Sequence, residues 1–410
     1  MLFSSLFAKT AEYEKLAHAL SAPGACALFG LPGSGRAMVY AALAKETGRF
    51  LCIVTPGEAE ATRFAGDLNA LGIPTAVFPA RDYVLRPIEG TAREYEYRRL
   101  SVLGDIVGGR LQAVCVPDEG LTQYTTPRAE FCNNTRTLHP GDTVPRTELT
   151  ALLYNAGYAR RAQVDGPGQF SIRGDIVDLY APDMKLPVRM EFWGDEIDTM
   201  HTFDLATQRR EDPIEKIYVS PAREVLFGSP AEAAELLRAF IKKFRGKKRT
   251  ALEACLATEL AQLDGGALPV NMDKYLAVRY PQPATLLDYF DDPLLVLEEP
   301  ASLREAERAT TYRRGEEISA LLQDGVLAAG LDNLYAENGY LWAQAANHRT
   351  ICAENFARSM PDMPLKDIVN APAHTLPAWG GEVTSLLEDL QPLCNGGAAV
   401  TVLAGTQRAA

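Results

Sequence analysis

The stretch ACALFGLPGSGRAMVYAALAKET, residues 25–47, decides the fold. Its first five residues are apolar and predict a buried strand, and a helical pattern runs from about Gly35 to Thr47. A glycine-rich turn that starts at Gly30 separates the two. A strand, a glycine loop and a helix in this order are typical of the phosphate corner of an α/β domain. The stretch therefore predicts a parallel sheet covered by helices.

The same alternation extends outward on both sides of this stretch. Further apolar runs predict short strands, and amphipathic segments between them predict helices. The predicted strands are 50–54, 75–78 and 112–116, and the predicted helices are 58–71 and 91–107. Strands that alternate with helices pair in parallel, so residues 1–128 are expected to form the first half of one α/β domain.

The pattern changes to hairpins between residues 129 and 211. Residues 188–193 alternate apolar and polar side chains, and residues 193–196 predict a tight turn. One helix is expected at about 148–155. Residues 129–211 are therefore interpreted as a small α+β module inserted into the first domain.

Helical periodicity returns after residue 212. Helices are expected at 231–244, 250–263 and 303–322, with a strand at 294–297, and residues 212–360 are interpreted as the second half of the α/β domain. Residues 361–410 are interpreted as a proline-rich linker and the start of a further small α/β domain, with a helix at 382–390 and a strand at 398–402.

The glycine loop has the spacing of a phosphate loop but not its chemistry. The motif is G-x-x-x-x-G-K-[ST], in which the lysine reaches the β and γ phosphates and the hydroxyl binds magnesium. Here the lysine position is Arg36 and the hydroxyl position is Ala37. The candidate residues of this degenerate nucleotide site are Gly30, Gly33, Gly35, Arg36, Ala37, Glu298 and Glu299. The glycines and the start of the helix keep the capacity to attract an anion.

Glu298 and Glu299 end an apolar strand, where nucleotide hydrolases place a magnesium-binding Asp and a catalytic Glu. Glutamate at the first position is one methylene longer and would displace the metal. The alternative interpretation is an acid pair on the surface where a helix begins. Together with Ala37, the pair favours a fold that has kept its shape and lost hydrolysis, so no catalytic residue is predicted.

Composition and charge exclude several classes of protein. The hydrophobic content of 47% is that of a packed globule. Seven scattered cysteines and five separated histidines predict no disulfide framework, no metal site and no cofactor, and they suit the cytoplasm. The net charge of −12 disfavours a nucleic-acid-binding role for the chain as a whole. One basic run, residues 242–249, is interpreted as a solvated helix end followed by a loop.

Several stretches resemble the bacterial transcription-repair coupling factors, and the first two also resemble the excision-repair helicase UvrB. They are GQFSIRGDIVDLY (168–180), PVRMEFWGDEID (187–198), TLLDYF (285–290), SLLEDL (385–390) and VLAGTQRA (402–409). The helicase is the weaker match because it needs a working phosphate loop and an aromatic hairpin that grips DNA. The resemblance therefore points to the N-terminal, UvrB-homology region of the coupling factors.

The resemblance implies a function. Such a region has a RecA-like lobe without ATPase activity, and it recruits UvrA to stalled RNA polymerase in transcription-coupled nucleotide excision repair. RNA polymerase and DNA are expected to be contacted only through downstream domains, including an ATP-dependent translocase, so the chain is interpreted as a fragment and not itself an enzyme. The alternatives are an active NTP-dependent helicase, disfavoured by Arg36, Ala37 and Glu298, and a DNA-binding module, disfavoured by the charge.

The resemblance also places the UvrA contact on arginines of the inserted module. They carry over to Arg173 and Arg160, although Ala159 or Arg161 could be the true equivalent of the second. Arginine presents a planar fork that fits a partner carboxylate. Phe170 and Tyr180 are candidate apolar anchors. The alternative for Arg173 is a surface salt bridge with Asp175 or Asp178.

Overall fold

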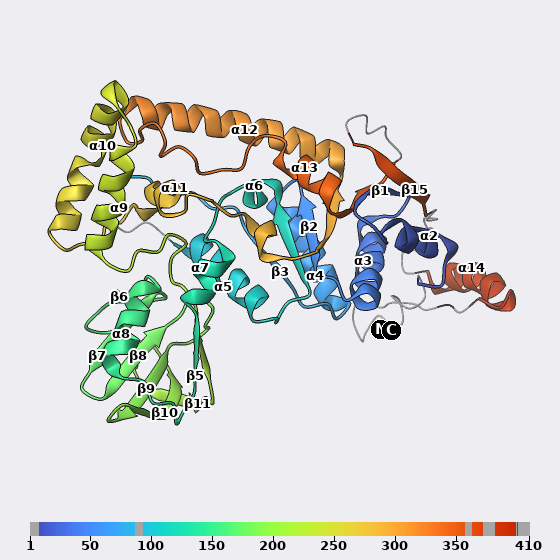
Figure 1. The fold of residues 1–410 in the computed structure, drawn as a ribbon. Coiled ribbons are helices and arrows are strands. Elements are labelled where there is room, and N and C mark those ends of the chain that lie inside the picture. The colour runs from blue at the N-terminus through green and yellow to red at the C-terminus, as the bar shows by residue number, and fades with distance from the viewer. Residues whose placement is uncertain (1–7, 87–92, 357–362, 372–381, 399, 401–410) are drawn as a thin grey trace. The chain divides into compact units, whose positions relative to one another are not determined.

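The computed structural model describes residues 8–86, 93–356, 363–371, 382–398 and 400 (Figure 1). The chain divides into two units, residues 1–371 and 372–410. The second unit contains helix α14 (Val383–Asn395), and most of the strand expected at 398–402 lies outside the described residues, as does the stretch 402–409. No helix in the described ranges has both the length and the apolar character needed to cross a membrane.

The first unit is built on a parallel sheet of seven strands. In sheet order they are β15 (Leu365–Asn370), β1 (Gly24–Phe29), β14 (Arg349–Glu354), β13 (Leu294–Glu298), β2 (Leu51–Thr55), β4 (Ala113–Pro117) and β3 (Thr75–Val77). Four strands come from the beginning of the chain and three come from after the insertion. The prediction of a RecA-like α/β lobe formed by two separated segments is confirmed.

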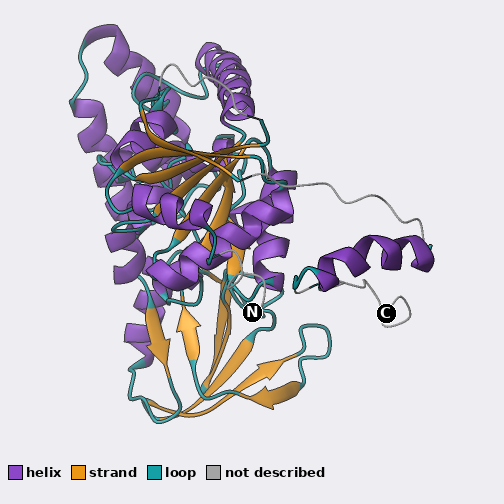
Figure 2. Cartoon of the chain, turned by 90° about the vertical axis from the view of Figure 1, so that its right-hand side faces the viewer, coloured by secondary structure: helices purple, strands orange, loops and turns teal. Residues whose placement is uncertain are grey.

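Helices cover both faces of this sheet (Figure 2). One face packs against α2 (Ala11–Ala19), α3 (Gly33–Thr47) and α4 (Glu58–Ala70). The other packs against α5 (Glu94–Val107), α7 (Arg128–Asn133), α12 (Pro300–Gln323) and α13 (Tyr340–Asn347). Short helix α6 (Asp118–Leu121) follows β4. Adjacent residues of one strand point to opposite faces of the sheet, and each face packs in its own apolar core. The strands are therefore apolar throughout, as is typical of buried parallel strands.

The inserted module is a six-stranded sheet with one helix, α8 (Arg146–Asn155). Its strands, in sheet order, are β11 (Arg210–Pro213), β10 (Glu196–Phe203), β9 (Val188–Trp193), β8 (Ile176–Tyr180), β7 (Gln169–Arg173) and β6 (Ala159–Arg160). The turn expected at 193–196 joins β9 to β10. A separate ribbon pairs β5 (Arg136–Leu138) with β12 (Ile217–Val219), which lies past residue 211.

A helical layer follows the insertion. It contains α9 (Pro230–Lys242), α10 (Gly246–Asp264), α11 (Leu276–Arg279) and the 3₁₀ turns Met272–Tyr275 and Leu286–Tyr289. Helices α9 and α10 pack in one apolar cluster with α11, the turn Met272–Tyr275 and the loop after α12. The basic run differs from its interpretation, because α10 begins at Gly246 and residues 247–249 lie in the first turn of a helix.

Strand β15 falls in the stretch interpreted as a linker. Its sequence, LKDIVN, lies at the edge of the sheet and pairs only with β1. An edge strand buries fewer side chains, and only Val369 of β15 is fully buried. The apolar pattern was therefore too weak to predict a strand.

Candidate functional site

The glycine loop is shorter in the structure than a phosphate loop. Strand β1 ends at Phe29 and α3 begins at Gly33, so only residues 30–32 stay outside regular structure. The amide of Arg36 donates to the carbonyl of Pro32 at 2.9 Å, which closes the first turn of the helix. Two of the three motif glycines therefore belong to the helix, and the loop that would wrap the phosphates is reduced to three residues.

The chain's own groups cover this loop. Arg63 of α4 packs so closely on Gly33 that a Cβ there would clash with its guanidinium. The carbonyl oxygen of Ala371 lies 2.7 Å from where a Cβ on Gly30 would be, and Gly30 has a φ of +88°. The amide of Ala371 also donates to the carbonyl of Phe29 at 2.9 Å. The positive φ and the close backbone of Ala371 account for Gly30 without a phosphate, whereas the contact at Gly33 is with the movable end of Arg63.

Arg36 is paired with the two acids of the β13 end. Its Nη1 lies 3.1 Å from Glu298 Oε2 and donates to Glu299 Oε1 at 2.9 Å. The hydroxyl of Tyr40 donates to the other oxygen of Glu298 at 2.5 Å. Arg36, Tyr40 and Glu298 are buried, so the structure brings the two degenerate motifs together as one internal cluster.

The electrostatics of this cluster favour pairing within the chain. Burial raises the pKa of Glu298 to about 7, and the charge of Arg36 and the hydrogen bond from Tyr40 oppose the shift. Burial works to lower the pKa of Arg36, but the charge of Glu298, together with Tyr40 and the hydrogen bond and charge of Glu299, outweighs burial and raises that pKa. The guanidinium is therefore held by carboxylates at the position where a lysine would face phosphates.

These residues do not fit a magnesium nucleotide. Ala37 is completely buried and offers no oxygen, and the cation beside it is neutralised by Glu298 and Glu299. In the part of the chain that the structure describes, no group of three or more His, Cys, Asp or Glu side chains could hold a metal ion.

The second candidate site is the six-stranded sheet of the module. One face packs on α8 through residues such as Phe170, Val177 and Met190. The opposite face carries Arg173 of β7, which donates to Asp178 of β8 at 2.5 Å and is 45% exposed. Side chains two residues apart on a strand share a face, so polar groups alternate with the core residues along each strand.

Asp178 holds two arginines at once. It is fully buried and also accepts bonds from Nε and Nη2 of Arg189, at 2.7 and 2.9 Å. The pair of Arg173 with Asp178, weighed as an alternative from the sequence, is present, whereas Asp175 pairs with Arg146 at 2.7 Å. One carboxylate against two guanidinium groups leaves this group of three side chains with one positive charge in excess.

The other predicted contact residues are placed differently. Arg160 and Arg161 are exposed at edge strand β6, and Arg161 lines a groove of about 1030 Å³ between the module and the segments around Arg223 and Leu268. Phe170 is completely buried and stacks edge-on against Tyr154 at 5.4 Å, so it is not available as an exposed anchor. Tyr180 is partly exposed and donates to the carbonyl of Lys185.

One exposed aromatic residue was missed from the sequence. Trp193 at the end of β9 is 84% exposed. It lies two residues beyond Glu191, which is paired with Ile176, and Ile176 is in turn paired with Arg173. The alternation of β9 therefore places Trp193 on the same face of the sheet as Arg173. The sequence feature that could have predicted this exposure is a large apolar residue at a tight turn, where no other element covers it.

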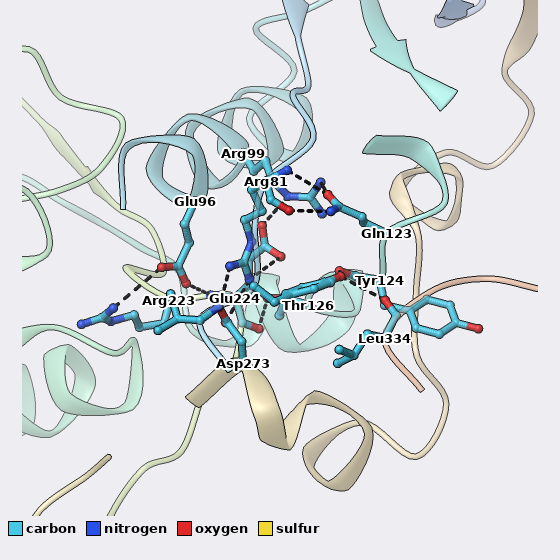
Figure 3. Close-up of polar contacts among 12 residues, drawn as sticks. Arg81, Glu96, Arg99, Gln123, Tyr124, Thr126, Arg223, Glu224, Asp273 and Leu334 are labelled. Carbon is cyan, nitrogen blue, oxygen red and sulfur yellow. Dashed lines mark hydrogen bonds and ion pairs between the residues drawn. The ribbon is translucent and has the colours of Figure 1, made fainter. Parts of the chain in front are cut away.

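A buried ionic cluster at the base of the module was also missed. Glu224, just after β12, accepts bonds from Arg99 Nε at 2.6 Å and Arg81 Nη2 at 3.3 Å (Figure 3). Arg81 also makes two bonds to Asp273, at 2.7 and 3.0 Å. The amide of Glu224 donates to Glu96 Oε1 at 3.0 Å, and burial raises the pKa of Glu96 to about 7.

The backbone at Glu224 ties the two ends of the insertion together. Its carbonyl accepts bonds from Thr126 Oγ1 at 2.6 Å and from the hydroxyl of Tyr280 at 3.1 Å. Thr126 precedes the module and Glu224 follows it. The cluster therefore fixes the point where the chain leaves the lobe and returns to it.

Comparisons with known proteins agree with this architecture. Residues 137–225 match a family model described as the UvrB interaction domain. A transcription-repair-coupling factor of Bacillus subtilis (strain 168) is 26% identical over 375 residues, which are 89% of this chain and 32% of the relative. A relative of the same name from Staphylococcus haemolyticus is 26% identical over 309 residues, 72% of this chain and 26% of the relative. One from Staphylococcus epidermidis is 23% identical over 391 residues, 92% of this chain and 33% of the relative. The chain thus spans about a third of the length of these relatives or less.

Proposed function

Since residues 137–225 match the UvrB interaction domain, in a chain similar over most of its length to transcription-repair-coupling factors, we propose that it is an adaptor that recruits UvrA during transcription-coupled nucleotide excision repair. The observation that carries the proposal is the position of the matched segment. It is a separate sheet module with one open face, joined to the lobe at a buried ionic cluster. The link to stalled RNA polymerase is proposed for the two thirds of such a protein that lie outside this chain.

The docking surface that we propose is the open face of the module sheet. Arg173 and Arg189 share a single carboxylate there, so the face attracts a partner carboxylate. Trp193 takes the place of Phe170 as the apolar anchor, because it is the largely exposed aromatic residue of that face, whereas Tyr180 is only partly exposed. Arg160 and Arg161 are exposed at the neighbouring edge strand β6. Arg160 is paired with Phe170 of the packed face, so the alternation favours Arg161 as the addition to the open face.

Replacing Arg173 by alanine is expected to weaken UvrA binding about 30-fold, which corresponds to about 2 kcal/mol. Alanine is preferred to glutamate, because Asp178 keeps its two bonds to Arg189 whereas a new acid would face a buried one. The measurement is a titration of purified UvrA against the chain, without DNA and at fixed salt concentration.

The matched control is the double variant Lys247→Glu with Lys248→Glu, whose positions lie on α10 outside the module. It should bind UvrA like the parent. Equal binding by the Arg173 variant and the parent would remove this face from the proposal. Separate Arg160→Ala and Arg161→Ala variants decide which of the two arginines takes part.

The lobe is proposed to have no ATPase activity. We expect no hydrolysis above background and no tight binding of Mg-ATP by calorimetry, because Arg36 is already paired and Ala37 cannot bind magnesium. The double variant Arg36→Lys with Ala37→Thr should not restore activity, since position 37 is fully buried and threonine would overpack it. Turnover at the rate of a motor ATPase by a clean preparation would contradict the proposal.

A further inference from the structure

The corner between α9 and α10 concentrates positive charge. Six of the eight residues from 242 to 249 are lysine or arginine, and all six are exposed. The rest of the chain carries −18, which is the total of −12 less these six charges. The run forms the end of α9 and the first turn of α10, and these two helices pack against each other. The six charged residues therefore lie together at one end of a helical pair (Figure 1).

The chain supplies almost no counter-charge to this corner. Arg249 pairs with Glu253 at 2.8 Å. The other five cations, which are Lys242, Lys243, Arg245, Lys247 and Lys248, form no ion pair with any carboxylate of the described residues. Lys243 only lies over the ring of Phe240, at 5.9 Å from its centroid. Five mutually repelling charges in one place favour an external polyanion.

The position of three of these cations is unfavourable for the helix itself. A helix N-terminus carries partial positive charge and is stabilised by acids. The first turn of α10 contains Lys247, Lys248 and Arg249, has no acidic residue and has no side-chain cap. This arrangement opposes helix stability, and departures of this kind from local preference are expected at functional sites.

The chemistry of the corner fits a phosphate backbone better than a protein partner. Protein interfaces are built around apolar and aromatic anchors and are depleted of lysine. Among the described residues, no large apolar side chain of α9 or α10 is exposed, and four of the six cations are lysines. Binding to phosphates needs only cations in reach of one another.

We propose that residues 242–249 bind the backbone of duplex DNA without sequence preference. The duplex is favoured over a single strand, because single-strand sites stack bases on exposed aromatic rings and this corner presents none. A duplex also carries one charge per about 1.7 Å along its axis, so several phosphates lie within reach of a compact group of cations. The surface gives the chain a DNA contact of its own, in contrast to the expectation drawn from its overall charge. It is independent of the proposal for UvrA.

Fluorescence anisotropy with a labelled 30-base-pair duplex tests the inference. With three to five phosphates contacted, raising NaCl from 50 to 200 mM should weaken binding by about 40- to 500-fold. The double variant Lys247→Glu with Lys248→Glu should bind at least about 10-fold more weakly than the parent at 50 mM NaCl. The control, Lys185→Glu with Lys216→Glu, makes the same change in net charge at exposed sites of the module and should bind like the parent.

A second readout separates binding from folding. The variant at 247 and 248 should melt at a higher temperature than the parent, because glutamates at a helix start are favourable. Loss of DNA binding by this variant together with a higher melting temperature would support a functional surface.

Equal DNA binding by the 247–248 variant and the parent would overturn the inference. So would no binding by the parent at 50 mM NaCl, or tighter binding to vesicles with anionic lipid than to the duplex. Loss of UvrA binding by Arg173→Ala with unchanged DNA binding would show that the two surfaces are separate.

Discussion

Replacing Glu224 by alanine is expected to lower the free energy of unfolding by about 3–5 kcal/mol. Glu224 is fully buried and is the carboxylate that Arg99 meets, at 2.6 Å, in a position where Arg99 has no exposed surface. Truncation would leave that guanidinium buried with neutral hydrogen-bond partners, which are the carbonyl of Pro79 and Oε1 of Gln123, each at 3.1 Å, and the carbonyl of Gly120 at 3.4 Å. A buried charge without a counter-charge is far more costly than a missing hydrogen bond.

Urea denaturation followed by circular dichroism measures this change. The control is Glu215→Ala, an exposed acid just before β12, which should stay within about 0.5 kcal/mol of the parent. Because Glu224 also joins the two ends of the insertion, limited proteolysis of the variant should cut near residues 126 and 224 before it cuts within the strands. A loss below about 1 kcal/mol would mean that the module is held by other contacts.

Replacing Arg36 by methionine is expected to lower the free energy of unfolding by about 3–5 kcal/mol. The loss should be larger at high pH than at low pH. The change leaves Glu298 buried without its cation. In the parent, burial already raises the pKa of Glu298 from 4.5 to about 7, so the folded state binds more protons than the unfolded state between these values. The contribution of Glu298 to stability is therefore full below pH 4.5 and is lost as the pH rises through about 7. Without Arg36 the pKa of Glu298 rises further, so more stability is lost as the pH rises.

Melting temperatures of the parent and three variants at pH 5.5 and pH 8.5 check this prediction. The difference in melting temperature between the parent and Arg36→Met should be larger at pH 8.5 than at pH 5.5. Glu298→Gln should remove the part of the pH dependence that comes from this group. The double variant Arg36→Met with Glu298→Leu should recover most of the stability, because an apolar pair of similar volume avoids the desolvation of both charges. A difference in melting temperature that does not change with pH would show that Glu298 is not the group that loses its counter-charge in the variant.

Much of the fold followed from local patterns. The continuous apolar strands around Ile53 and Val296 and the glycine turn after Phe29 predicted a parallel α/β lobe, and the alternation from Val188 to Phe192 predicted the module sheet. These signals are local because each buried strand must be apolar whatever it pairs with. Strand β15 was not predicted, because only one of its side chains is fully buried and its apolar pattern is correspondingly weak.

The sequence by itself determined that position 37 offers no hydroxyl to a magnesium ion, since alanine lacks one in any conformation. It also indicated which module to examine for a partner. Only the tertiary structure decided which groups pair with Arg36, because Arg36 and Glu298 are 262 positions apart and meet only when β1 and β13 join one sheet. The same holds for Arg99 and Glu224, and for the exchange of Phe170 for Trp193 as the exposed aromatic residue. Pairing and exposure depend on which elements pack together, and that information is not contained in the residues nearby in the chain.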